Sequence, residues 1–236
     1  MLGTALLRRV QMRLPSSLMM ARRPVVRLYS SGAQWRRPNG WGTPAGQGFV
    51  VGGLIAANAL VFMRWQLVET QREQRYMVDN FTCSAASAAS RPWTLATSVF
   101  SHNLPMHFAV NMLVLYSFGP LTIRAIGVQR FLALYFMGGL VSNIAHVAYS
   151  RYSGGDRPAH GASGAINSLI VAFACMFPKS EFLVMGFIPV RAPIAVGLFA
   201  LYDFFFLGDR SIIGHAAHLG GFAFGILYYV LRLRVR

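Results

Sequence analysis

The chain has 236 residues, of which 55% are hydrophobic and only 12% are charged. Soluble domains carry about 25% charged residues, so this composition excludes an ordinary soluble globular protein and indicates a membrane protein. The formal net charge of +15 comes from 22 basic and 7 acidic residues, and only one of the basic residues, Lys179, is a lysine. The arginines are unevenly placed along the chain, which does not describe a nucleic-acid-binding surface.

The first 37 residues carry eight arginines and no acidic residue, which is the composition of a mitochondrial transit peptide. A cationic segment is attracted to anionic lipid and is drawn toward a negative matrix at about 2.3 kcal/mol per charge per 100 mV. Arg27-Leu28-Tyr29 before Ser30 resembles the pattern cut by the matrix processing peptidase. We therefore predict cleavage after Tyr29, which removes six arginines and lowers the net charge from +15 to +9. The alternative is a disordered basic tail on a bacterial or secretory-pathway membrane protein.

Six apolar runs of about membrane-span length follow. They cover residues 48–63, 104–123, 131–149, 161–178, 192–208 and 211–231. The apolar stretch 182–190 is expected to lie at the membrane interface or to fold back before the fifth span. The forty-residue connection 64–103 is long enough to predict a functional or partly structured loop. The predicted organisation is a transit peptide (1–29), a linker (30–46) and an all-α membrane domain of six transmembrane helices (47–236).

The basic residues of the short loops place both termini on one side of the membrane, which is the matrix side for a mitochondrial protein. The second, fourth and sixth spans then all enter from the opposite face. Four polar residues in their first turns, His107, Asn111, Ser163 and His218, would lie within roughly 12 Å of that face, given a rise of 1.5 Å per residue. Polar groups inside hydrocarbon are costly and usually functional, so these four are the candidate site.

Ser163 lies in Gly161-Ala162-Ser163-Gly164, where a loop is expected to become the fourth span. The first N–H groups of a helix lack intrahelical acceptors and carry the positive end of the dipole, which suits an oxyanion. A serine there can attack a carbonyl while its own N–H binds the developing oxyanion. Gly161 and Gly164 would let the backbone bend and a substrate chain approach. Taken alone, the motif also fits a packing face of small residues.

His218 is followed by Gly221 and Gly225, a Gly-xxx-Gly pair that allows close approach of another helix. Close approach to Ser163 is what a Ser–His hydrogen bond requires. His215 and His218 are three residues apart, but the spacing and the glutamate of the His-Glu-x-x-His zinc motif are missing, so we predict no metal and no other cofactor. His215 lies one turn nearer the water and also fits a simple interfacial histidine.

His107 and Asn111 are four residues apart and share one helix face, so both can donate hydrogen bonds into one cavity. They would complete the oxyanion site, or merely hydrate a helix end. The loop and helix-end histidines His102, His146 and His160 receive little catalytic weight. Asp203 can pair with Arg210 or a helix terminus and need not join the site. Cys83 and Cys175 fall near opposite faces, too far apart for a disulfide.

Taken together, these motifs resemble the rhomboid intramembrane serine proteases, and the transit peptide makes the sequence most similar to the mitochondrial inner-membrane, presenilin-associated-rhomboid-like group. The resemblance covers residues 47–236 and rests on four motifs in order: Arg91-Pro92-Trp93-Thr94, His107-x-x-x-Asn111, Gly161-Ala162-Ser163-Gly164 and Ala217-His218-Leu219-Gly220-Gly221-x-x-x-Gly225.

The resemblance implies a six-helix rhomboid-like bundle that cleaves single-span membrane proteins through a Ser163–His218 dyad without an acidic third member. His107, Asn111 and the Ser163 N–H would stabilise the oxyanion, and the fifth helix would act with the last loop as a lateral gate. The implied partners are single-pass membrane substrates and membrane lipids, and a homo-oligomer is allowed. The alternatives are a catalytically silent rhomboid-like protein that binds and escorts clients, and a polar-lined channel or transporter, which would need a polar path across the whole membrane.

Overall fold

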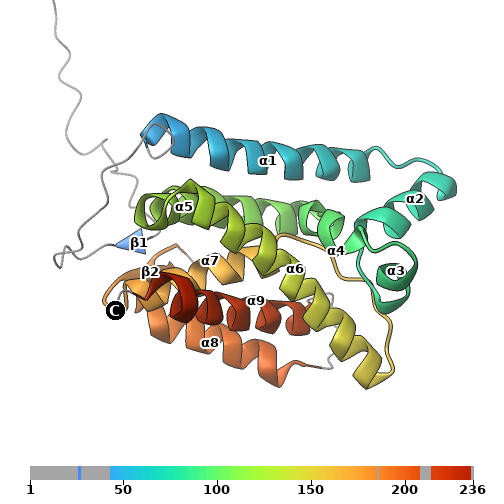
Figure 1. Cartoon of the computed structure of the whole chain (residues 1–236). Helices are drawn as coiled ribbons and strands as arrows, with labels where there is room; N and C mark the ends of the chain where they lie inside the picture. Colours follow the sequence, from blue (N-terminus) through green and yellow to red (C-terminus); the bar gives the residue numbers. More distant parts are fainter. Residues whose placement is uncertain (1–25, 28–42, 185, 208–213, 235–236) are drawn as a thin grey trace, which may run out of the picture.

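The computed structural model describes residues 26–27, 43–184, 186–207 and 214–234, and helices dominate it (Figure 1). Among these described residues, four helices are long and apolar enough to cross a membrane: α1 (Pro44–Gln66), α5 (Pro105–Ile126), α6 (Val128–Ser153) and α9 (His215–Tyr228) with its π-helical continuation η4 (Tyr229–Leu233). Two shorter apolar helices, α7 (Ser163–Met176) and α8 (Ala192–Phe205), have 14 residues each. Each of the six predicted spans therefore contains one helix, although only four reach spanning length.

Proline and glycine mark several of the helix ends. Pro44 and Pro105 stand at the start of α1 and α5, where a missing N–H costs nothing because the first turn has no acceptor for it. Gly127, with φ of 83°, links α5 to α6, and Gly154, with φ of 71°, ends α6 in the left-handed conformation. Because Gly127 is the only residue between α5 and α6, the chain reverses there and the two helices lie next to each other.

The connection between α1 and α5 is a structured loop, as its length predicted. It contains α2 (Gln71–Phe81), α3 (Ala85–Ser90), α4 (Thr94–Thr97) and the 3-10 helix η3 (Ser98–Phe100). A capping box between Thr70 and Glu73 starts α2. The backbone N–H groups of Glu69 and Thr70, followed by Arg64, lower the pKa of Glu73 to about 2.

Contacts within the loop and across to the segment before α7 hold it in place. Arg91 pairs with Asp79, and the indole of Trp93 donates to the side chain of Asn80. Cys83 and Ala159 exchange two backbone hydrogen bonds of 2.7 and 2.8 Å. The loop is therefore hydrogen-bonded to the segment that leads to Ser163.

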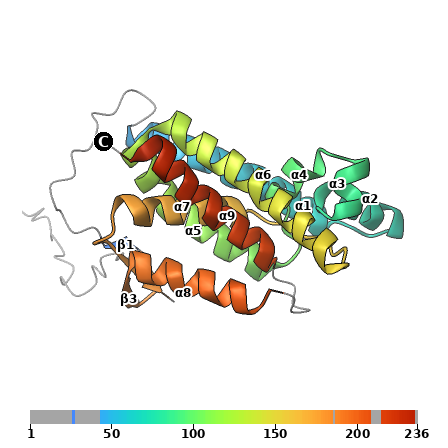
Figure 2. The ribbon, with the colours of Figure 1, turned by 60° about the horizontal axis from the view of Figure 1, so that its bottom comes forward.

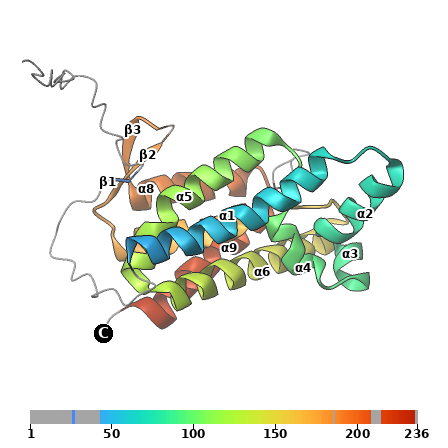
Figure 3. The same cartoon turned by 90° about the horizontal axis from the view of Figure 1, so that it is seen from above.

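A small antiparallel sheet, in the order β1-β2-β3, departs from the all-α expectation (Figure 3). It consists of β1 (Val26–Arg27), β2 (Glu181–Val184) and β3 (Ile188–Arg191), with Phe182 opposite Val190 and Val26 opposite Phe182. The expected fold-back at 182–190 is thus a hairpin, which two short β-prone runs and the turn glycine Gly186 explain. Of the predicted transit peptide and linker, all but residues 26–27 and 43–46 lie outside the described residues.

The centre of the molecule is made by α6, α7 and α9, with α1 packed on α5 at one side and α8 along α9 at the other (Figures 1 and 2). Small residues permit this close packing. Ser142 of α6 donates a hydrogen bond of 2.7 Å to the Ala217 carbonyl of α9, and Ser168 of α7 donates one of 2.9 Å to the Gly221 carbonyl. The helices α5, α7 and α9 all begin at one end of the bundle, where the candidate residues lie.

Both cysteines are free. Cys83 is buried in the long loop, and desolvation followed by the charge of Asp156 raises the pKa of its thiol to about 11. It is therefore a neutral thiol at physiological pH.

Candidate active site

Ser163 is the first residue of α7, and the backbone before it is held by two hydrogen bonds. The Gly161 N–H donates to the Ser98 carbonyl over 2.8 Å, and the Ala162 N–H donates to Nε2 of His102 over 3.2 Å. Gly161 has a φ of 128°, a left-handed conformation that residues with a side chain rarely adopt. The loop therefore presents Ser163 at a helix amino terminus in one fixed conformation.

His218 of α9 contacts Ser163 directly. Its Nε2 lies 2.8 Å from the Ser163 Oγ, within hydrogen-bond distance. The contact depends on the close approach of α7 and α9, because a Cβ on Gly221 would meet the backbone of Gly164, and a Cβ on Gly164 would lie 3.5 Å from the Ala217 carbonyl oxygen. The small residues around the motif thus bring a serine hydroxyl and an imidazole into hydrogen-bond contact.

A carboxylate stands on the other side of the His218 ring. The two oxygens of Asp203, in α8, lie 3.1 and 3.2 Å from Nδ1 of His218, and one of them lies 2.7 Å from Nδ1 of His215. An ionised carboxylate only accepts hydrogen bonds, so with Asp203 ionised this geometry requires the proton on Nδ1 of His218 and leaves Nε2 as the acceptor that faces Ser163.

This arrangement differs from the expected dyad without an acidic member. Asp203 pairs with two histidines rather than with a helix terminus, and Arg210, its other expected partner, lies outside the described residues. An aspartate inside an apolar span was a signal for a functional residue, because such a group needs a polar partner in hydrocarbon.

His107 lies against the loop that precedes Ser163. A Cβ on Gly161 would come within 2.7 Å of its Cε1 and 3.0 Å of its Nε2. Asn111 is buried and donates a hydrogen bond of 2.8 Å to the His107 carbonyl, inside its own helix. The geometry thus places the His107 ring at the wall of the site, while the oxyanion role of both residues stays a prediction.

His102 and His160, which received little catalytic weight, surround His107. Their ring centroids lie 4.9 and 6.2 Å from that of His107. Burial, followed by the nearby histidines, lowers the pKa of His102 to about 3, so the ring is neutral and can accept the Ala162 N–H. The sequence carried no signal for this contact, because its donor is a backbone group sixty residues away.

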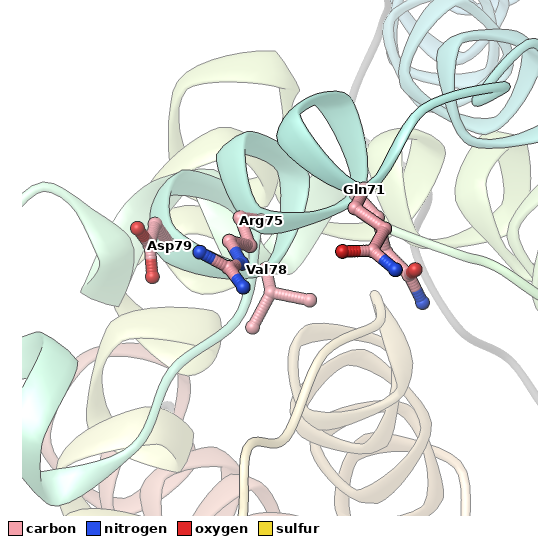
Figure 4. Close-up of a pocket in the computed structure, with 5 residues that line it drawn as sticks. Gln71, Arg75, Val78 and Asp79 are labelled. Carbon is pink, nitrogen blue, oxygen red and sulfur yellow. The ribbon is translucent and has the colours of Figure 1, made fainter.

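No cluster of three or more His, Cys, Asp or Glu side chains suited to a metal ion occurs in the described part of the chain. His215 and His218 share a carboxylate instead. A separate open hollow of about 330 Å³ is lined by residues of α2: Gln71, Gln74, Arg75, Val78 and Asp79 (Figure 4). None of these residues belongs to the helices that carry Ser163, His218 or Asp203, so the hollow is not part of this site.

Comparisons with known proteins show which family the sequence matches. Residues 89–235 match the family described as Rhomboid domain. The chain is 37% identical over 195 residues to the mitochondrial presenilin-associated rhomboid-like protein of Mus musculus, an alignment that covers 75% of this chain and 47% of that protein. It is 34% identical to the mitochondrial RHOMBOID-like protein 12 of Arabidopsis thaliana (74% and 55% covered) and 31% identical to the mitochondrial Rhomboid protein 1 of Saccharomyces cerevisiae (74% and 51%). The chain thus spans about half the length of these curated relatives.

Proposed function

This chain belongs to the rhomboid family, and we propose that it is an intramembrane serine endopeptidase with Ser163 as nucleophile and His218 as base. The observation that carries the proposal is the 2.8 Å contact between the Ser163 Oγ and the His218 Nε2, made where Ser163 opens a helix. A hydroxyl is a weak nucleophile unless an adjacent base removes its proton, and this contact supplies that base.

In the proposed reaction the Ser163 Oγ attacks the carbonyl carbon of the scissile peptide bond while the His218 Nε2 takes its proton. The tetrahedral oxyanion is bound by the Ser163 N–H, with the side chains of His107 and Asn111 completing the site. The C–N bond then breaks and His218 protonates the leaving amine. His218 then deprotonates a water molecule, which attacks the acyl carbon. The bond between that carbon and the Ser163 Oγ breaks, His218 returns the proton to Oγ, and the second product leaves as a carboxylic acid.

The substrates we propose are single-span membrane proteins cut within or near their transmembrane segment. α5, α7 and α9 begin at the same end of the bundle (Figure 1), and in the proposed six-span arrangement this end faces one membrane surface, where water and an unwound peptide can both reach the site. We also propose that α7 and α8 complete a six-span bundle. At 1.5 Å per residue each is only about 21 Å long, so the aqueous site at the start of α7 would account for its short length.

The proposed location is the mitochondrial inner membrane, with both termini in the matrix and residues 1–29 removed on import. The arginine-rich start of the chain supports it, as do three curated relatives whose names describe mitochondrial proteins. The test of import is a fusion of residues 1–29 to a reporter, which we expect in the matrix. Retention of that fusion in the cytosol would contradict the location.

The activity is tested with the purified chain in liposomes and a fluorescent single-span reporter, with a chelator present. We expect cleavage by the wild type and its loss in Ser163→Ala and in His218→Ala. Glu69→Gln, which changes an exposed carboxylate before α2, is the matched control and should cleave normally. A folded wild-type protein that captures the reporter as well as both variants do, yet never cleaves it, would favour a client-binding rhomboid-like protein instead.

A further inference from the structure

The carboxylate of Asp203 lies at Nδ1 of His218, on the side of the ring opposite to Ser163. We propose that Asp203 is a positioning residue for His218, and that it makes proteolysis depend on the packing of α8 against α9. This inference deepens the proposed protease function and rests on it. Asp203 is thus added to the Ser163–His218 pair as a residue that orients the imidazole. It belongs to α8, which lies outside the central group of helices α6, α7 and α9.

The first step concerns the imidazole itself. A neutral imidazole has one donor and one acceptor nitrogen, and only the form with the proton on Nδ1 offers a lone pair to the Ser163 hydroxyl. Both oxygens of Asp203 lie within hydrogen-bond distance of that Nδ1. The carboxylate thus selects the useful tautomer, fixes the ring, and balances the positive charge that His218 acquires when Ser163 loses its proton.

The second step concerns the way α8 is attached. The buried residues of its first half are the apolar Ala192, Ala195 and Val196, whereas Asp203 is the buried residue of its second half. Its other side chains near that end are exposed, among them Leu201, Phe204 and Phe205. Ring contacts of Tyr202 with His215 and a hydrogen bond from Tyr149 to the Leu207 carbonyl complete the attachment.

It follows that a movement of this end of α8 away from α9 removes the partner of His218. The same movement that opens a path between the two helices would leave the imidazole free to rotate and to change tautomer. The site would be assembled only when α8 lies against α9.

The energetics argue against a purely structural carboxylate. Burying a charged group between helices is expensive, and a leucine, which has the same branched shape but is larger and apolar, would hold α8 at no desolvation cost. The carboxylate receives two Nδ1–H donors, from His215 and His218, which reduces that cost but does not explain why an acid is there. A role toward His218 does explain it.

The experiment compares Asp203→Asn, which keeps an acceptor oxygen without the charge, with Asp203→Leu, which removes both. We expect kcat to fall about a hundredfold or more in both variants, the size typical of a lost acid–base contribution, with KM nearly unchanged. Leucine offers no acceptor, and the asparagine NH₂ group can donate to Nδ1 and favour the wrong tautomer. Phe205→Leu, an exposed neighbour on α8, is the matched control for disturbance of the helix. His215→Phe leaves the His218 partner in place and is expected to lose about tenfold less activity than Asp203→Leu.

The second readout does not depend on turnover. Nitrogen-15 NMR of histidine-labelled protein reports the tautomer of His218, whose signals are identified by their absence in His218→Gln. We expect the Nδ1–H form in the wild type and a shift toward the Nε2–H form in Asp203→Leu. If Asp203→Leu fails to fold, Asp203→Asn, which is close to isosteric, still tests the loss of kcat.

The outcomes separate the two proposals. If the folded wild type never cleaves the reporter but the tautomer of His218 depends on Asp203, the proposed function is wrong, while the inference that Asp203 positions the His218 ring is supported. A wild type that cleaves, with unchanged kcat and tautomer in both Asp203 variants, overturns the positioning role alone. Equal losses in His215→Phe and Asp203→Leu would also overturn it, because the carboxylate would then act through the packing of α8 and not through His218.

Discussion

The closest backbone approach in the site, between α7 and α9, gives a sharp prediction for Gly221→Ala. The added Cβ would lie 3.0 Å from the Gly164 carbonyl carbon and closer still to its oxygen. Carbon atoms prefer about 3.5–4.0 Å, so the two helices must separate by about 0.5–1 Å. No side-chain rotation can relieve this contact, because the position of a Cβ is set by its own backbone and the Gly164 atoms that it meets are backbone atoms.

The separation falls one helical turn from His218. It would stretch the 2.8 Å contact between the Ser163 Oγ and the His218 Nε2 to roughly 3.5 Å, beyond useful hydrogen-bond length. A displacement of this size costs about 10²-fold in rate. Overpacking of the helix contact costs a further ~1–3 kcal/mol of stability.

The assay measures kcat on the single-span reporter and thermal unfolding in the same detergent. Gly53→Ala in α1 and Gly197→Ala in α8 are the matched controls, because a Cβ at either position meets nothing within 4 Å. They should keep full activity and gain about 0.5–1 kcal/mol from the higher helix propensity of alanine. If Gly221→Ala retains the wild-type kcat and unfolding temperature, the reasoning that backbone contact sets the Ser163–His218 distance is wrong.

Three further predictions concern the loop that precedes Ser163. Gly161→Ala should lower kcat about tenfold or more, because the left-handed φ is strained for alanine and the new Cβ would contact the His107 ring. The unfolding temperature and kcat of this variant should therefore both decrease. Asp156→Ala removes the acceptor of the Ala86 N–H at 3.0 Å and of the Ser84 hydroxyl, and should lower the unfolding temperature by a few degrees while Glu69→Ala does not. Because burial holds the pKa of His102 near 3, against 6.5 when unfolded, the unfolded chain binds more protons between these values, so stability should fall as pH drops from about 6.5 toward 3. Thermal unfolding of His102→Gln should show a shallower slope in that window, and an equal slope would contradict the assignment.

The elements that sequence reasoning placed well are those set by one-dimensional properties. Each of the six apolar runs contains a helix, although only four of these helices reach spanning length, and helix parity predicted that Ser163 and His218 lie at the same end of the bundle. Gly221 was informative because a missing side chain in a membrane helix has few other uses than close packing. These inferences require only counting along the chain, so they did not depend on how the helices are arranged around one another.

The contacts that escaped prediction depend on lateral order and on helix rotation. The bond from the Ala162 N–H to His102 and the backbone pairing of Cys83 with Ala159 join segments about sixty and seventy-six residues apart, and backbone groups leave no mark in the sequence. The strands β2 and β3 were anticipated only in part. The sequence predicted a fold-back or an interfacial segment at 182–190, but strands of four residues in a continuously apolar stretch show no alternation from which their pairing could be predicted.

Asp203 lies between these two cases. Its charge inside an apolar run demanded a partner, and its depth near the end of α8 limited the choice to groups at the same membrane face. Depth alone could not choose among Arg210, a helix terminus and the histidines of α9, because that choice depends on which face α8 turns toward its neighbour. The buried residues of α8, at 192, 195, 196 and 203, recur at intervals of three, one and seven and so form a single stripe. The sequence alone does not show this stripe, because exposed positions of α8 such as Leu198 and Leu201 are as apolar as the buried ones. The partners of Asp203 therefore follow only from the rotation of α8 about its own axis.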